Sequence, residues 1–182
     1  MRRLGGLAAA LALLCAGCGS ASSSPPPAVP TLPASAVAYL PSTVKPLSAS
    51  FLAREAQAPE LRAQLGGWGF VAGRRRYFQG ESRRLQVVDS RTLRFRGGGG
   101  ANAFVAFVRS HLNPYLGGFP AVRPLASAGR TGFVATAQEC QCHLANPAYL
   151  AAVARGGTVT WLEINGPGAN RRMLAALLAR AP

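Results

Sequence analysis

Acidic residues are scarce in this chain, which has 6 Asp and Glu residues against 20 Lys and Arg residues and a formal net charge of +14. No two carboxylates form an evident pair along the sequence, so candidates for acid–base catalysis are few. The chain also lacks the Gly-x-Ser-x-Gly and His-Glu-x-x-His patterns of hydrolases, and Gly97–Gly100 lacks the Gly-Lys-Ser/Thr ending of a phosphate-binding loop. The sequence therefore favours a non-enzymatic protein, although it does not exclude an enzyme.

Lysine is almost absent, because Lys45 is the only one, and the basic charge is carried by scattered arginines. Arg74–Arg76 is the only run of three, and aromatic residues do not alternate with the arginines as they do on base-stacking surfaces. The composition therefore argues against nucleic-acid binding. It predicts instead an attraction to anionic phospholipids or to an anionic polymer of the cell envelope.

Long apolar runs are missing except near the N-terminus, where residues 4–14 form an apolar stretch of about a dozen residues, too short to span a bilayer. Arg2 and Arg3 precede it, and Ala16-Gly17-Cys18 follows it. This arrangement resembles the lipobox of bacterial lipoproteins. The resemblance implies that residues 1–17 are a signal peptide and that Cys18 receives a thioether-linked diacylglycerol. An ordinary secretory signal, cleaved elsewhere, is the alternative.

A lipidated Cys18 predicts a protein held by its acyl chains on the extracytoplasmic face of the cell membrane, or on the outer membrane of a cell with two membranes. Residues 19–35 contain five prolines among small polar residues, and Pro41 and Pro46 follow. We therefore expect a tether over residues 18–49 and a single domain over residues 50–182. No cofactor is predicted apart from the covalent lipid, and the oligomeric state is left open.

Cysteine is rare, with four residues in the chain. Cys15 leaves with the signal and Cys18 carries the lipid, so Cys140 and Cys142 remain, followed by His143. These three residues could form a strained disulfide, remain free thiols, bind a soft metal ion or provide a nucleophile with its base. The disulfide is the favoured hypothesis, and a thiol-redox or metal-handling protein is the alternative function.

The apolar periodicity predicts an α+β fold in which two helices pack on one face of an antiparallel sheet. We expect a helix from Ser50 that Pro59 interrupts, and a second one after Asn102. The expected strands are Gly69–Phe78, Leu85–Phe95, a short edge strand near Val122, Thr131–Ala137 and Thr158–Ile164. Pro147–Ala154 is expected to be a helical turn, and the chain to end in a helix.

Two segments of the sequence also resemble each other. Leu93–Asn102 and Leu162–Asn170 are both expected to lead from a strand through a glycine turn to an asparagine before a helix. This suggests a possible ββα-ββα repeat, whose order is similar to that of the PsbP/Mog1-like and ferredoxin-like folds.

Together these observations predict a ligand-binding or partner-binding protein of the envelope. Five aromatic residues either line an apolar ligand site on the sheet or pack beneath the helices: Phe70, Tyr77, Phe95, Phe133 and Trp161.

Overall fold

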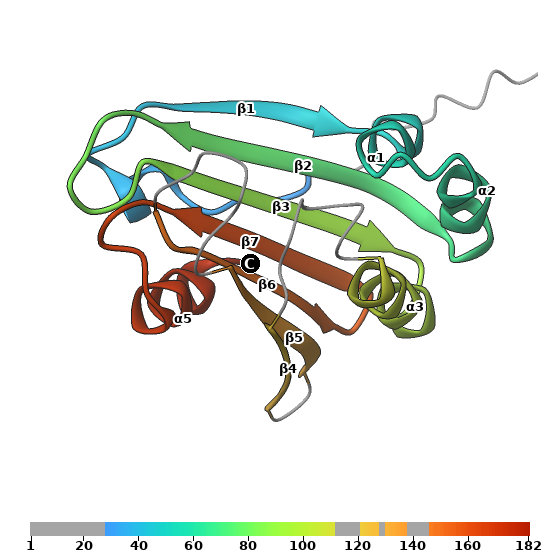
Figure 1. The fold of residues 1–182 in the computed structure, drawn as a ribbon. Coiled ribbons are helices and arrows are strands. Elements are labelled where there is room, and N and C mark those ends of the chain that lie inside the picture. Colours follow the sequence, from blue (N-terminus) through green and yellow to red (C-terminus); the bar gives the residue numbers. More distant parts are fainter. Residues whose placement is uncertain (1–27, 112–120, 128–129, 138–145) are drawn as a thin grey trace, which may run out of the picture.

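The computed structural model describes residues 28–111, 121–127, 130–137 and 146–182, which form one antiparallel sheet with helices on both sides (Figure 1). The sheet has seven strands in the order β1-β2-β3-β7-β6-β5-β4. The predicted α+β class with an antiparallel sheet is therefore confirmed. No helix of the described residues is long and apolar enough to cross a membrane.

Strands and helices follow one another along the chain without strict alternation. The strands are β1 (Ser42–Leu47), β2 (Phe70–Gln79), β3 (Val87–Phe95), β4 (Ala121–Ser127), β5 (Arg130–Ala137), β6 (Ala148–Arg155) and β7 (Thr158–Asn165). The helices are the 3₁₀ turn η1 (Ala34–Val37), α1 (Ala49–Glu55), α2 (Glu60–Gly67), α3 (Gly98–Ser110) and α5 (Arg171–Arg180).

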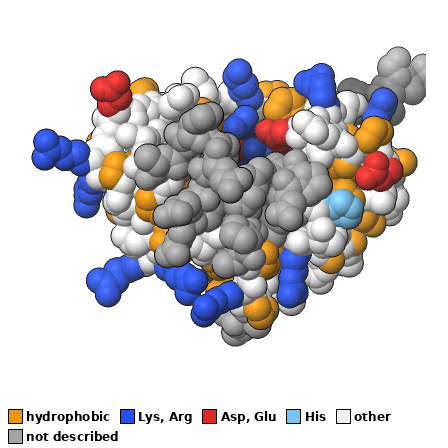
Figure 2. Space-filling model, viewed as in Figure 1, with side chains coloured by type: hydrophobic (Ala, Val, Ile, Leu, Met, Phe, Trp, Pro, Cys, Tyr) orange, Lys and Arg blue, Asp and Glu red, His pale blue; other side chains and the backbone are white. Residues whose placement is uncertain are grey.

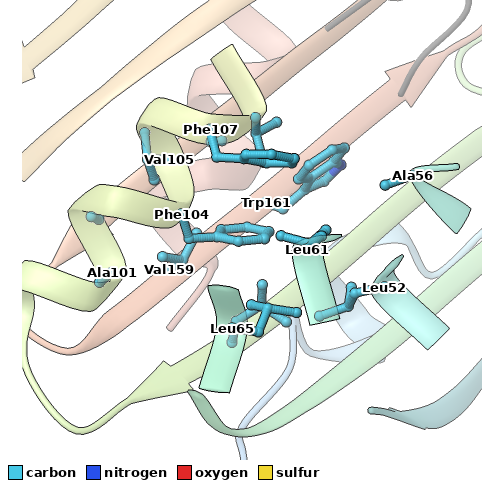
Figure 3. Packing of buried hydrophobic residues seen from close by; sticks show 14 of the residues in the cluster. Leu52, Ala56, Leu61, Leu65, Ala101, Phe104, Val105, Phe107, Val159 and Trp161 are labelled. Carbon is cyan, nitrogen blue, oxygen red and sulfur yellow. The ribbon is translucent and has the colours of Figure 1, made fainter. Parts of the chain in front are cut away.

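One face of the sheet, called here the α3 face, is covered by α1, α2 and α3. Figure 3 shows side chains of these three helices pointing toward one another above Val159 and Trp161 of β7. Phe104 of α3 is fully buried there, and its ring lies 5.8 Å from the ring of Phe95. Because each large apolar side chain buried in this way contributes about 1.5–3 kcal/mol, this cluster is the main core of the domain.

The opposite face, called here the α5 face, carries a second core under η1 and α5. Leu162 and Ile164 of β7 point to this face, and they pack with Leu174 and Leu177 of α5. The sequence predicted that two helices share one face, whereas the final helix lies on the other one. The reason is the period of two in β7, which is apolar on both sides and therefore needs a cover on each.

The segment expected to be a helical turn at Pro147–Ala154 is instead β6, a strand in the interior of the sheet. It pairs with β5 on one side and with β7 on the other. Its sequence, AYLAAVAR, is rich in alanine, which favours helices. Tertiary pairing overrides this propensity, because small side chains fit where both faces of a strand are covered.

The segment before residue 50, expected to be irregular, is part of the folded structure. Residues 42–47 form β1, which pairs with β2 and accommodates Pro46 because it lies at the edge of the sheet. Leu32, Val37 and Leu40 are buried in the second core. Residues 28–49 therefore pack against the sheet rather than acting as a solvated spacer.

The helices begin and end close to the positions that the sequence predicts, with small differences at their caps. Pro59 separates α1 from α2, as predicted, but Ser48 rather than Ser50 caps α1, with its Oγ accepting a hydrogen bond from the Phe51 N–H. Asn170 caps α5 through the Met173 N–H. Asn102, its counterpart in the similar segment Leu93–Asn102, lies inside α3. The two asparagines therefore do not share the role of helix cap.

Several sequence predictions fall outside the described residues. These are the signal over residues 1–17, the lipid on Cys18 and the cluster of Cys140, Cys142 and His143. They stay predictions. His111 follows directly on α3, and its ring stacks on Phe107 with 3.9 Å between the ring centroids.

Candidate functional site: a groove beside α3 and a charge network on the sheet

A groove with a volume of about 600 Å³ runs between α3 and β5. Its lining residues are Asn102, Val105, Ala106, Arg109, Ser110, Thr131, Gly132 and Phe133. The helix contributes the first five because positions three and four apart lie on one side of a helix. The volume lies within the range of small-molecule sites in proteins.

The lining of the groove is apolar in its depth and polar at its ends. Phe133 is fully buried at its floor, whereas Ala106 and Arg109 are exposed on α3. The Thr131 hydroxyl donates a hydrogen bond of 2.5 Å to Asn102 Oδ1, which joins β5 to the helix. Arg109 makes no ion pair with the described residues, so its guanidinium is available to an anionic group. The groove can therefore hold an apolar body with an anionic end.

The aromatic residues considered from the sequence do not form one ligand surface. Phe95 and Trp161 are buried in the main core, and Phe70 packs against it. Phe133 belongs to the same core but also reaches the groove. Tyr77 lies apart, beside a group of charged residues on the α3 face. The alternative that these rings pack beneath the helices therefore holds for most of them.

A charge network occupies the α3 face where β2, β3 and β7 run side by side, and it was not predicted. Its centre is Asp89, which is buried on β3. Asp89 Oδ1 accepts a 2.7 Å hydrogen bond from Arg75 Nε, and Oδ2 accepts one of 2.8 Å from Arg75 Nη2. This bidentate pairing fixes both side chains and is among the stronger interactions of its kind.

A second arginine, Arg91, joins the same carboxylate from the same strand. Arg91 Nη2 lies 2.6 Å from Asp89 Oδ2, and Arg91 also pairs with Glu55 of α1. The Arg91 guanidinium lies over the Trp161 ring, with its central carbon 4.9 Å from the ring centroid. Since Arg91 is buried, these partners compensate a charge that would otherwise be costly to remove from water.

The remaining carboxylate of the network is Glu163 of β7, which lies directly opposite Asp89 in the register of β3 and β7. Glu163 makes no hydrogen bond or ion pair with the described residues. Burial raises the pKa of its carboxyl group to about 7, and the Asp89 carboxylate acts in the same direction, while Arg91 and Arg75 oppose it. Glu163 is therefore poised to take up or release a proton near neutral pH.

Tyr77 of β2 completes this part of the face. It faces Asp89 across the β2–β3 pair, and the Arg75 guanidinium carbon lies 4.6 Å from the centroid of its ring. Burial raises the pKa of the Tyr77 phenol above its usual value, which Arg75 partly offsets. The phenol consequently stays protonated and can donate a hydrogen bond at neutral pH.

Sequence inspection missed this network because its members are far apart along the chain. Asp89 and Glu163 become neighbours only through the pairing of β3 with β7. One sequence signal was available, since β3 carries Asp89, Arg91 and Arg94, and β7 carries Glu163, among residues that are mostly apolar or hydroxylated. Their cross-strand pairing could not be derived from that signal alone.

The charges on the surface differ from this ordered arrangement. Figure 2 shows basic side chains spread around the edge of the α3 face rather than gathered in one patch. Within the part of the chain that the structure describes, no three His, Cys, Asp or Glu residues are grouped to hold a metal ion. The charge network is thus built around arginines rather than as a metal-ligand set.

Comparisons with known proteins give little further information. No family model matches the chain, and no curated protein sequence matches it. Among solved structures, the extracellular domain of PknH from Mycobacterium tuberculosis is similar, with a TM-score of 0.45 and 13% sequence identity, over 78% of this chain and 76% of that one. A similarity of this size assigns neither a fold family nor a function.

Proposed function

We propose that this protein is a non-enzymatic binding protein of the cell envelope, anchored through a lipid on Cys18, and that it holds an amphipathic ligand in the groove between α3 and β5. The N-terminal pattern supports the location, because Arg2, Arg3 and the short apolar stretch precede Ala16-Gly17-Cys18. The groove supports the binding role, and its combination of an apolar floor with Arg109 at the edge is the observation on which the proposal rests.

The residues of the groove favour a ligand with an unbranched apolar part and a single negative charge. Ala106 and a small part of Val105 offer apolar surface to an alkyl chain beside the buried Phe133, and the hydrophobic contribution is about 0.8 kcal/mol for each buried CH₂ group. Arg109 can bind a carboxylate or a phosphate in two-point geometry. A long-chain fatty acid is the simplest probe that has both features.

Binding is tested with a fluorescent fatty acid and with the alcohol of the same chain length. The protein used is residues 19–182, which contain every described element and avoid the need for detergent. Ala106→Trp should abolish binding of both probes, because Ala106 is exposed on α3 and a larger side chain there would fill the groove. Arg109→Gln should weaken binding of the acid about tenfold and leave the alcohol unchanged.

Two matched variants control for general effects of the substitutions. Ala179→Trp places the same bulky ring on an exposed position of α5, and Arg172→Gln removes an exposed charge from the same helix. Both should bind like the unchanged protein. Equal binding by Ala106→Trp and the unchanged protein would contradict the proposal.

Anchoring is a separate part of the proposal and has its own test. Expression of the full chain with Cys18→Ser should prevent lipid attachment, so the protein should move from the membrane fraction to the soluble fraction of the cell. Cys15→Ser is the matched control and should stay with the membrane. A membrane-bound Cys18→Ser variant without lipid would favour an ordinary attachment through the uncleaved signal.

A further inference from the structure

Basic side chains from separate parts of the chain meet at the start of α5. Arg171 is the first residue of this helix and is exposed. The loop between β2 and β3 lies beside it, because the Gly168 N–H donates a 2.8 Å hydrogen bond to the Arg84 carbonyl oxygen. Figure 1 shows this loop and the start of α5 at the same end of the sheet. Arg83 and Arg84, both exposed, are thereby placed next to the first turn of α5.

A cleft between α5 and the strands β4 and β5 brings a fourth arginine to this place. Its volume is about 260 Å³. Arg123 and Arg171 line the cleft, and both are exposed. Its other lining residues include Leu174, which is buried, and Leu125 and Val134, which are half-buried. The cleft therefore joins an apolar floor to two guanidinium groups.

The four arginines, called here the arginine patch, are Arg83, Arg84, Arg123 and Arg171. None of them makes an ion pair with the described residues. Glu81 lies two residues before Arg83 and offsets one of the four charges. The first turn of α5 has no acidic residue, and a cation at that position opposes the helix dipole. The patch therefore keeps a positive charge that does not stabilise α5.

An exposed aromatic residue extends the arginine patch. Tyr39 follows η1, and 44% of it is exposed. The central carbon of the Arg84 guanidinium lies 5.7 Å from the centroid of the Tyr39 ring. Tyrosine combines an apolar ring with a polar hydroxyl and is enriched where proteins meet the membrane–water interface. The surface around the start of α5 is therefore amphipathic as well as cationic.

The chain enters the fold on the same face of the sheet. Leu32 is buried in the second core, under α5. Arg180, in the last turn of α5, donates a 3.3 Å hydrogen bond from Nη1 to the Ala36 carbonyl oxygen. Cys18, the predicted lipid site, precedes Ala28 by ten residues, which span at most about 36 Å when extended. A lipid on Cys18 would therefore hold the α5 face within reach of the membrane surface.

We propose that the arginine patch, with Tyr39 and the cleft beside α5, is the surface through which the domain lies on anionic phospholipids of the membrane. Guanidinium groups bind lipid phosphates in two-point geometry. The apolar floor of the cleft and the Tyr39 ring favour a bilayer over an anionic polymer, because a bilayer also presents apolar groups.

This inference extends the proposed function and rests on its membrane location. The lipid on Cys18 brings the domain to the membrane, and the arginine patch fixes the face that meets it. One acyl anchor together with a basic patch gives more stable attachment than a single anchor. The fatty-acid groove lies on the opposite face of the sheet, so it opens away from the membrane.

Binding is measured by co-sedimentation with vesicles of phosphatidylcholine alone or of an equimolar mixture of phosphatidylcholine and phosphatidylglycerol. The protein is residues 19–182, which include every residue of both hydrophobic cores and lack Cys18, so binding does not depend on the lipid. We expect saturable binding to the mixed vesicles only. Arg123→Gln combined with Arg171→Gln should weaken it about 25-fold, because each arginine near an anionic surface contributes about fivefold.

Arg54→Gln combined with Arg62→Gln is the matched control, because it removes the same charge from exposed positions on α1 and α2. It should bind the mixed vesicles within about twofold of the unchanged protein, since charges distant from the membrane are screened by salt. No binding to the mixed vesicles, or an equal loss in the two double variants, would overturn the proposal. Either result would leave the lipid on Cys18 and the fatty-acid groove unaffected.

A further variant separates a bilayer from an anionic polymer, with polyphosphate as the polymer probe. Tyr39→Ser should weaken binding to the mixed vesicles about threefold and leave binding to polyphosphate unchanged. Val71→Ser is its control, because it removes an equally exposed apolar side chain from β2 and should not change either binding. Tighter binding to polyphosphate than to the vesicles, with no effect of Tyr39→Ser, would assign the patch to a polymer and overturn the bilayer.

Discussion

The two faces of the sheet both combine an apolar part under helices with a polar part, but they balance charge in different ways. On the α3 face, Arg75 and Arg91 are joined to Asp89 and Glu55. On the α5 face, Arg94 and Arg155 line a hollow together with three threonines, Thr92, Thr158 and Thr160. The difference shows that the arginines of the α3 face compensate buried carboxylates, whereas those of the α5 face are surrounded by hydroxyl groups.

The largest change in the free energy of unfolding is expected from a substitution of Asp89, the central residue of the charge network. Asp89→Asn removes the charge that two arginines share and leaves the buried Arg91 with less compensation. We expect the free energy of unfolding to fall by about 3 kcal/mol, measured by urea denaturation. Glu81→Gln, at an exposed loop position, should change it by less than about 0.5 kcal/mol. A similar small change in Asp89→Asn would show that the network is not important for stability.

A smaller change in the free energy of unfolding, with the opposite sign, is expected from a substitution of Glu163. The pKa of this carboxyl is about 7 in the folded protein, above its ordinary value of 4.5, so the folded protein holds the proton more tightly than the unfolded chain. Its contribution to stability is therefore full below about pH 4.5 and is lost as the pH rises to about 7.

Glu163→Gln should remove this pH dependence. The variant should be more stable than the unchanged protein by about 1–2 kcal/mol at pH 8 and nearly equal to it at pH 4.5, as measured by thermal unfolding at a series of pH values. Glu60→Gln, on the exposed surface of α2, is the control and should follow the unchanged protein. A parallel pH profile for Glu163→Gln would disprove the assigned titration.

The smallest effect is expected on the α5 face. The Ser90 hydroxyl is fully buried and has no hydrogen-bond partner in the described part of the chain. Ser90→Ala should therefore leave the free energy of unfolding within about 0.5 kcal/mol or raise it slightly. Thr160→Val, which removes the bond to Pro182, should cost about 1 kcal/mol by comparison. Denaturation curves that reverse this order would show that the Ser90 hydroxyl is stabilising.

Much of the fold could be predicted from local patterns. The break at Pro59, the apolar stripe of α3, the edge strand near Val122 and strand β7 all agree with the sequence. The predictions that failed concern segments in which strand pairing outweighs the secondary-structure propensity of the local sequence. β6 is rich in alanine and still forms a strand between two neighbours, and β1 contains a proline that only an edge strand tolerates.

The candidate sites could be predicted far less well. The aromatic residues were recognised as candidates, but most of them pack under helices, and only Phe133 reaches the groove. The charge network and the hollow at Thr158 were both missed. Each depends on which residues face one another across strands, and a single sequence contains no direct record of that register.

The sequence by itself determined the composition of this protein, its strong positive charge, the periodicity of its main helices and the pattern that predicts a lipid on Cys18. These properties depend on residues that are near one another along the chain. Only the tertiary structure decided that Glu163 meets Asp89 and that Thr158 lies between two arginines. The physical reason is that cross-strand neighbours are chosen by the packing of the whole sheet, which buries one set of side chains on each face.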